Sequence, residues 1–517
     1  MKHIGVMTFL SLLLSGPLFG IELNKMERRA LFEVTAKQQL MTLVKAEEKI
    51  KTGAEVSPLF RDIGVLYHDY MKARDLKSSP KEFDLLVQDI MKPKTVDELA
   101  AAFGTLQSFN MPTPIRVRPG AKKGTIVISA LEKGPLSIAK SLDDRNRGRI
   151  IEKEFRVYYK KLLKMAQSSL SMTEVDQSLK LESQWASNLK KGSKDTEKSE
   201  PMTLASLKAQ YPFPWEKFFK SSGIKTGASF IIESPAGLKS KLASMKGPLK
   251  PLLVNQLFRA TDGLAPILSA PTRELHENFR KVAFNTKTNQ AVVSGLLLVQ
   301  GLLPDHLSMA YAAGFYWPDV QNKSEMVLKR AKRTLKDEIN GSSTISPELR
   351  KILVKRLDDA KIVVGYSDKF KMKEIGLKKG EFLKNIFKIQ RFRYMRTMSR
   401  KPQLPSVFQT WGTESVYISS KNTMYIPVGR LQFPFLAKVV KGKEWDYYEE
   451  LSSLLWRDLV SLMVFNAKNK DSAELVKKQK KALDQLVGAV PPTLGKKGGG
   501  LPKLRLMSCM RSDACPI

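Results

Sequence analysis

An apolar residue recurs at every fourth position after Ser324, and this spacing constrains the fold more than any other feature of the chain. The positions are Val327, Ala331, Leu335 and Ile339. Residues four positions apart lie on one face of an α-helix, so the spacing predicts a helix with one buried face that stops near Gly341.

A second helix is expected directly after the first. Ser346 is placed to cap it, and Pro347 falls in its first turn, where proline is tolerated. Its buried stripe comprises Leu349, Leu353, Leu357 and Ala360. The two segments together predict a helical hairpin.

Helical signals dominate most of the remaining sequence. Residues 26–51 contain neither glycine nor proline, and further helices are expected at 95–106, 149–170 and 473–487. Strand signals are few: a β-hairpin is expected at 113–131, and two short strands at 416–418 and 424–426. The sequence therefore predicts a mostly α-helical protein with a small amount of β-structure.

The chain is strongly basic. Its 517 residues include 87 Lys and Arg against 51 Asp and Glu, a net charge of +36. Such a charge attracts polyanions, among them nucleic acid and anionic envelope polymers. The densest run, Lys371 to Lys401, has eleven basic and two acidic residues with aromatic residues between them. Because basic residues are scattered over the whole chain and those aromatic residues have helical spacing, solvated faces and core packing are favoured over nucleic-acid binding.

The N-terminus indicates export. Lys2 and His3 precede the apolar run Ile4 to Leu14, and Gly20 is small enough for a cleavage site. This run is shorter than the ~20 apolar residues that span a membrane, so residues 1–20 are predicted to be a signal peptide. No later segment is apolar for long enough to be a transmembrane segment. The mature protein is expected to be periplasmic or extracellular.

The C-terminal residues 488–517 are expected to form a flexible basic tail. The chain's two cysteines, Cys509 and Cys515, both lie there. In an oxidising compartment they are predicted to form a disulfide that closes a small loop. Two cysteines alone do not supply the four ligands of a closed zinc site.

Five segments, in order and at compatible spacing, resemble the zinc metallopeptidases of the neprilysin and endothelin-converting-enzyme family. They are Leu181-Glu182 with Ala186; Pro201 to Leu204 with Leu207, Pro212 and Trp215; Leu303-Pro304 with Tyr311 and Phe315; Arg356-Leu357 with Val364 to Phe370; and Tyr417 with Asn422 to Phe435.

The resemblance implies a two-lobed architecture whose catalytic lobe is truncated. It implies an N-terminal helical region over residues 21–370, with the large helical lobe at about 75–370, followed by a remnant of the catalytic domain at 371–487. It also implies a substrate cleft along an edge strand. The candidate peptide-binding residues there are Glu414, Ser415, Tyr417 and Asn422.

The departures from the family pattern concern its chemistry. Where the family has His-Glu-x-x-His, this chain has Arg457-Asp458-Leu459-Val460-Ser461. A zinc helix needs two imidazoles four residues apart and a carboxylate to activate water. Of the edge-strand motif Asn-Ala-x-Tyr only Tyr417 is present. The 56 residues after Ser461 (517 − 461) contain no Gly-Glu-Asn-Ile-Ala-Asp segment and are expected to be too few for the rest of the catalytic domain.

No other metal site is expected. The four histidines are His3, His68, His276 and His306. His276-Glu277 imitates half of a zinc motif, but its second ligand position is Arg280, and a solvated helix face is the favoured interpretation of His276. His68 and His306 are interpreted as structural.

The favoured interpretation is an exported pseudopeptidase with no catalytic residues and no zinc, whose degenerate positions are Arg457, Asp458 and Ser461. It would bind a peptide or protein ligand without cleaving it, and a positive charge at Arg457 would favour an acidic ligand. One alternative is a basic module that binds an anionic envelope polymer or nucleic acid through Lys371 to Lys401 and the tail. The other is residual metalloendopeptidase activity.

Overall fold

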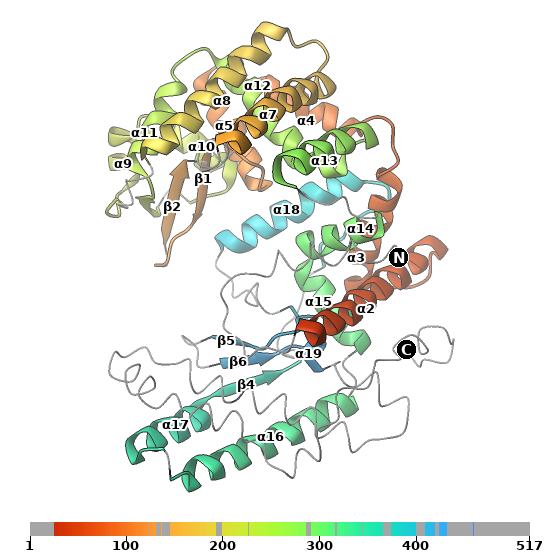
Figure 1. Cartoon of the computed structure of the whole chain (residues 1–517). Helices are drawn as coiled ribbons and strands as arrows, with labels where there is room; N and C mark the ends of the chain where they lie inside the picture. Colours follow the sequence, from red (N-terminus) through yellow and green to blue (C-terminus); the bar gives the residue numbers. More distant parts are fainter. Residues whose placement is uncertain are drawn as a thin grey trace. The chain divides into compact units, whose positions relative to one another are not determined.

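The computed structural model describes residues 25–122, 124–130, 136, 145–192, 199–225, 227–285, 291–315, 318–343, 345–365, 374–399, 409–418, 423–431 and 459. Helices form most of these segments (Figure 1). The chain divides into two compact units: unit 1 contains Val65–Leu298 and Ile375–Gln403, and unit 2 contains Leu10–Gly64, Val299–Glu374 and Leu404–Ile517. The predicted boundary between a helical region and a catalytic remnant at residue 370 stays a prediction.

Unit 1 combines a helical bundle with a three-stranded sheet. Its elements are the greater part of α3 (Pro58–Ala73), α4 (Lys81–Met91), α5 (Val96–Ser108), β1 (Ile115–Pro119), β2 (Thr125–Ala130), α7 (Arg145–Ala166), α8 (Met172–Gly192), α9 (Leu204–Gln210), α10 (Trp215–Ser222), β3 (Ser229–Ile232), α11 (Pro235–Ser244), α12 (Leu249–Leu264), the 3-10 turn η1 (Ala265–Ile267), α13 (Ala270–Phe284), most of α14 (Ala291–Leu302) and α18 (Phe382–Met398). The predicted hairpin at 113–131 is confirmed as the antiparallel pair β1–β2, and β3 adds to β2 in parallel.

An aromatic cluster forms the core between α10 and the sheet of unit 1. Trp215, Phe218 and Phe219 on α10 are fully buried. The Phe219 ring stacks on Phe230 of β3 with the ring centroids 4.8 Å apart. Burial of each such ring contributes roughly 1.5–3 kcal/mol to folding, so α10 is held firmly against the sheet.

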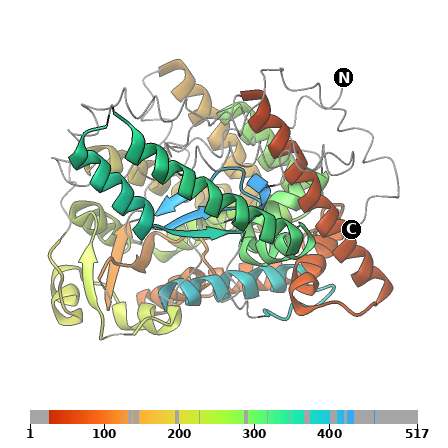
Figure 2. The same ribbon diagram turned by 90° about the horizontal axis from the view of Figure 1, so that it is seen from below.

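Unit 2 places a helical hairpin beside a second small sheet. Its elements are α2 (Lys25–Thr52), the start of α3, the end of α14, α15 (Pro304–Phe315), α16 (Pro318–Gly341), α17 (Pro347–Asp359), β4 (Lys361–Val364), β5 (Val416–Ile418), β6 (Thr423–Ile426) and α19 (Val428–Leu431). Seen from below in Figure 2, α16 and α17 run next to each other across the strands, and α16 contacts β4.

The predicted hairpin of helices is confirmed in detail. The Ser346 hydroxyl accepts a hydrogen bond from the Leu349 amide, as expected for an N-terminal cap. Leu335 and Ile339 of α16 and Leu353 of α17 are completely buried. The periodic apolar residues thus form the interface between α16 and α17.

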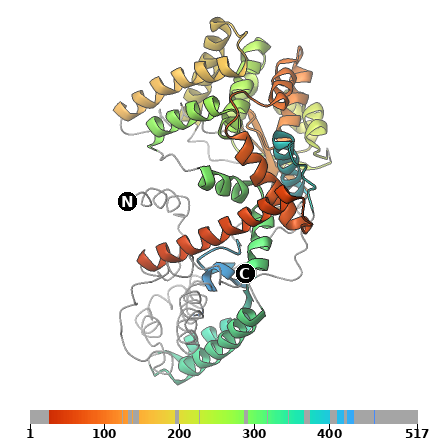
Figure 3. The ribbon, with the colours of Figure 1, turned by 90° about the vertical axis from the view of Figure 1, so that its right-hand side faces the viewer.

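The long helix α2 is held in unit 2 by polar contacts as well as apolar ones. Figure 3 shows it passing beside α15 and α19, both of which it contacts. Tyr311 of α15 donates a 2.6 Å hydrogen bond to the side chain of Gln38, and Gln300 of α14 bonds to Gln39. Burial raises the pKa of Tyr311 well above its ordinary value, so its hydroxyl remains a donor. Among the helices of the described residues, none has the length and apolarity required to cross a membrane.

We expect Gly104→Ala to destabilise unit 1. Gly104 lies where α5 crosses α10, and a Cβ there would come within 2.3 Å of the Phe218 carbonyl oxygen. Backbone atoms cannot give way as a flexible side chain does, so a loss of about 2 kcal/mol or more in unfolding free energy is expected. Gly301→Ala in α14 is the matched control, because nothing lies within 4 Å of its added Cβ. Urea unfolding that shows equal stability for both variants would contradict this packing.

Candidate functional site: the β5 edge of unit 2

The sheet of unit 2 ends, among the described strands, at β5. The strand order is β4-β6-β5, with β6 parallel to β4 and antiparallel to β5. Tyr417 of β5 lies opposite Met424 of β6. β4 is the other outer strand and lies next to the hairpin of α16 and α17, whereas β5 lies on the opposite side of the sheet (Figure 1).

The residues that lead into β5 are fixed to α15. The Thr410 hydroxyl donates a 2.6 Å hydrogen bond to the Ser308 carbonyl oxygen, and the Thr410 amide contacts the Ser308 hydroxyl at 3.4 Å. The next residue, Trp411, is buried. These contacts set the position from which the strand starts.

The short helix α19, which follows β6, holds the same segment. The Gly429 amide donates a 2.7 Å hydrogen bond to the Thr410 carbonyl oxygen. The buried Arg430 guanidinium donates to the Thr413 carbonyl oxygen at 3.0 Å. A hydrogen bond from a buried charged donor is a strong restraint, so Arg430 fixes the entry to β5.

The structure describes only three of the four predicted peptide-binding residues. Glu414 is exposed and Ser415 half-buried immediately before β5, and Tyr417 belongs to the strand itself. Asn422, Arg457, Asp458, Ser461, Cys509 and Cys515 lie outside the described residues, as do the predicted signal peptide and tail. Leu459, between the degenerate positions, is described and completely buried.

The predicted surface position of His276 is wrong. Its side chain is buried on α13, where Nδ1 lies 2.9 Å from the Tyr158 hydroxyl and 3.4 Å from an Asp262 carboxylate oxygen. Tyr158 in turn donates a 2.6 Å hydrogen bond to Asp262. Burial, reinforced by the Asp262 charge, raises the pKa of Tyr158 above its ordinary value. The cluster joins α7, α12 and α13, so the histidine is structural.

The other described histidines are buried too, as expected of structural residues. His68 lies on α3, and His306 on α15 lies with its Nε2 3.7 Å from a buried Asp62 carboxylate oxygen. Within the described parts of the chain no three His, Cys, Asp or Glu side chains gather as a metal site requires. The positions that correspond to the zinc motif, Arg457, Asp458 and Ser461, lie outside these parts.

A buried ionic network in unit 1 includes Glu182, one of the residues that carry the family resemblance. Its carboxylate pairs with Arg259 at 2.5 Å and accepts a 3.0 Å hydrogen bond from Asn255. Burial raises the pKa of Glu182, but Arg259 and the bond from Asn255 outweigh it and hold this pKa below its ordinary value.

The same network contains a buried lysine. The Lys241 ammonium lies 3.7 Å from the centre of the Trp185 ring. Burial, with repulsion from Arg259, lowers the pKa of Lys241 well below its ordinary value. Lys241 and Glu182 are almost inaccessible to solvent, so the network belongs to the packing of α8, α11 and α12.

Several residues that position β5 were not expected from the sequence. Thr410 and Arg430 sit in segments without periodicity, and their partners are more than ten residues away in the chain. The sequence alone does not predict a strand at β4, and Val364 was named only as part of a segment that resembles the family. The available signal was the strand's run of β-branched residues, Ile362, Val363 and Val364, but four residues are too few to distinguish a strand from a helix end.

The comparisons with known proteins give one family and one fold. The profile of peptidase family M13 matches residues 26–367. The open state of zinc metalloprotease Zmp1 from Mycobacterium tuberculosis superposes with a TM-score of 0.71 at 16% identity, covering 92% of this chain and 78% of that one. PepO from Lactobacillus rhamnosis gives a TM-score of 0.57 at 14% identity, covering 89% and 76%. No curated protein matches the sequence.

These similarities confirm the resemblance to the neprilysin-type peptidases and the mostly helical fold expected from it. At identities this low the solved structures establish the fold alone.

We expect Gly429→Ala to loosen the entry to β5. An added Cβ would lie 2.4 Å from the Trp411 carbonyl oxygen and 2.7 Å from that of Gly412, so α19 must move. Hydrogen exchange should then become at least about tenfold faster in β5 and β6, because local opening of a strand costs less once its packing is strained. Gly314→Ala in α15, where the Cβ meets nothing within 4 Å, is the control. Exchange in β5 that stays at the wild-type rate would contradict the restraint described.

Proposed function

The chain belongs to peptidase family M13, and we propose that it is a non-catalytic member that binds an extended peptide along β5 without cleaving it. The observation that carries this proposal is the sequence Arg457-Asp458-Leu459-Val460-Ser461 at the position of the family's zinc motif. The burial of Leu459 supports the proposal, because an apolar residue within the zinc-motif helix is expected to face the core.

The loss of chemistry follows from the ligands themselves. Zinc in a catalytic site is held by three protein ligands, of which the helix normally supplies two imidazoles. Neither arginine nor serine can take that place. Asp458 retains a carboxylate, but a general base needs an activated water within reach. The residues that remain can bind and orient a peptide and have no group that activates water.

The capacity to bind depends on a different part of the site. An extended peptide can add to the outer edge of a sheet through backbone hydrogen bonds, which require no particular side chain. β5 is the outer described strand away from α16 and α17, and its entry is held by Thr410, Gly429 and Arg430. Glu414, Ser415, Tyr417 and Asn422 are proposed to line this edge.

Charge and compartment complete the proposal. Arg457 would place a positive charge near the former metal position, which favours an acidic side chain or a carboxylate on the ligand. Residues 1–20 are proposed to direct export, so that the ligand is met in the periplasm or outside the cell.

The alternative of a basic polymer-binding module has weaker support. Aromatic residues that stack on bases or sugars must be exposed. In the Lys371 to Lys401 run, Phe382 and Tyr394 are buried, and Phe387 stacks on Phe109 with ring centroids 5.4 Å apart. These aromatic residues serve the packing of α18 against the rest of unit 1.

A photo-crosslinking experiment tests the binding site. We expect a benzoylphenylalanine at position 415 to capture a peptide from an acidic peptide library, because Ser415 leads directly into β5. The matched control is the same group at Lys361, which is exposed on the opposite outer strand, β4. Equal capture at both positions, or capture at 361 alone, would argue against the β5 edge.

A digest tests the absence of catalysis. We expect the purified chain to leave a broad peptide library intact, with and without a chelator, because both imidazoles of the zinc motif are missing. Any cleavage should persist in Asp458→Ala, which would identify it as contamination. Chelator-sensitive cleavage that disappears in Asp458→Ala would support the residual metalloendopeptidase instead.

A further inference from the structure

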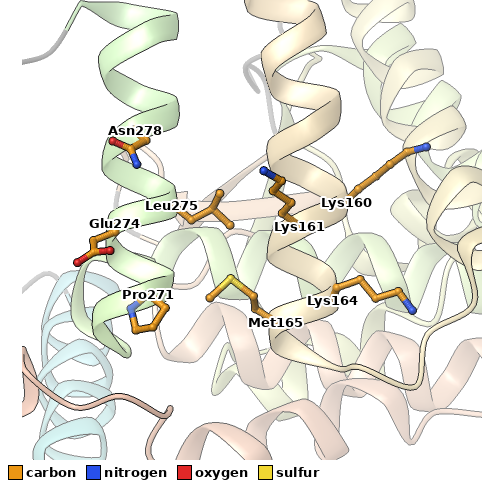
Figure 4. Close-up of a pocket in the computed structure, with 8 residues that line it drawn as sticks. All are labelled: Lys160, Lys161, Lys164, Met165, Pro271, Glu274, Leu275 and Asn278. Carbon is orange, nitrogen blue, oxygen red and sulfur yellow. The ribbon is translucent and has the colours of Figure 1, made fainter.

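A shallow groove between the C-terminal half of α7 and the N-terminal half of α13 opens on the surface of unit 1. The two helices are antiparallel: near the start of α7, Arg147 donates to the carbonyl oxygens of Val282 and Ala283 at the end of α13, at 2.8 and 3.0 Å. At the other end, Met165 and Pro271 line a cavity of about 600 Å³ (Figure 4).

An exposed apolar stripe extends from this groove along the surfaces of both helices. On α7, Ile150, Val157 and Met165 are 46%, 44% and 42% exposed. They are separated by seven and eight residues, about two helical turns each, and therefore lie on one face. Leu275 and Val282 stand at the same two-turn spacing on α13, and Val282 is 44% exposed. Single exposed apolar residues are ordinary, but a stripe along both helices marks a contact surface.

The charges of the groove are unequal on its two sides. Lys160, Lys161 and Lys164 line it from α7, and Glu274 lines it from α13. In Figure 4, Lys161 extends toward the space between the helices, whereas Lys160 and Lys164 point outward. Lys160 pairs with Asp176 at 2.7 Å, and Lys164 donates to backbone carbonyl oxygens. Lys161 has no such partner among the described residues, so its charge is available to a ligand.

We propose that this groove binds an amphipathic helix of an acidic partner protein. From Ile150 to Met165 the stripe is about 22 Å long at 1.5 Å per residue, which accommodates roughly four turns of a helix. Apolar side chains of the partner helix, spaced by one and two turns, would pack against the stripe. Acidic side chains beside them would pair with Lys161 on α7. A second copy of this chain is a poor occupant, because two molecules of net charge +36 repel each other.

This interaction is independent of the proposed peptide site. The groove belongs to unit 1 and β5 to unit 2, and the two sites differ in the form of ligand that they bind. An extended peptide bonds through its backbone at a sheet edge, whereas a helix has satisfied its own backbone and binds through side chains.

Fluorescence anisotropy with the full chain tests the proposal. The probe is a labelled synthetic helix of about 18 residues, with leucines along one face and glutamates on the flanks. We expect saturable binding that Met165→Glu and Lys161→Glu each weaken by at least about fivefold, as loss of a central contact does. Lys217→Glu on α10 makes the same charge change at an exposed position outside the groove and should leave the affinity unchanged.

Two further measurements separate specific docking from charge attraction. A probe of identical composition whose leucines are spread around the helix should bind at least about fivefold more weakly. Thermal melts by circular dichroism should show that all three variants are folded. The absence of saturable binding to the wild-type chain, or equal weakening by Lys161→Glu and Lys217→Glu, would overturn the proposal.

Discussion

The close approach of Gly429 to the backbone of Trp411 is the contact on which the position of β5, the proposed binding edge, depends. It leaves no room for a side chain, and it brings α19 onto the segment that leads into β5. Arg430 and Thr410 then hold that segment with hydrogen bonds to the Thr413 and Ser308 carbonyl oxygens. Strands of three or four residues are not stable alone, so these restraints, together with α15 and α19, give the edge strand its fixed place.

Binding and catalysis place different demands on such a site. A sheet edge recognises a peptide through main-chain groups, which tolerate almost any change of side chain provided that the strand keeps its position. A metal centre tolerates very little, because each ligand must be a particular donor at a particular distance. A member of this peptidase family can therefore lose its zinc ligands and keep the means of holding a peptide. The proposed loss of zinc would leave the buried pair of Glu182 and Arg259 in unit 1 in place.

Local regularity made much of the fold predictable. The stripe from Val327 to Ile339, the cap at Ser346 and the alternation in 113–131 each determine a structure from residues close together in the chain, and each is confirmed. The family was predictable because short segments kept their residues and their order. The pairing of β4 with β6 was not, because Val364 and its partner Ile426 are distant in sequence and no local signal links them.

Polar residues in the core were also hard to predict. His276 lies among charged residues on α13 and has the pattern of a surface position, yet its ring is buried because Tyr158 and Asp262 supply partners from other helices. The buried Gln38 and Arg430 are similar cases, since a polar side chain enters a core only where a distant partner satisfies it. For the candidate site, the sequence identified the strand that holds Tyr417 and missed the residues that position it.

The zinc content of the purified protein tests the central claim most directly. Native mass spectrometry of the full chain, after incubation with excess zinc and removal of the unbound metal, reports how many ions each molecule retains. The account predicts a mass equal to that of the metal-free chain, unchanged by a chelator. One zinc ion per chain that survives buffer exchange and is removed by the chelator would contradict it, and would show that this member of the family has kept a metal centre.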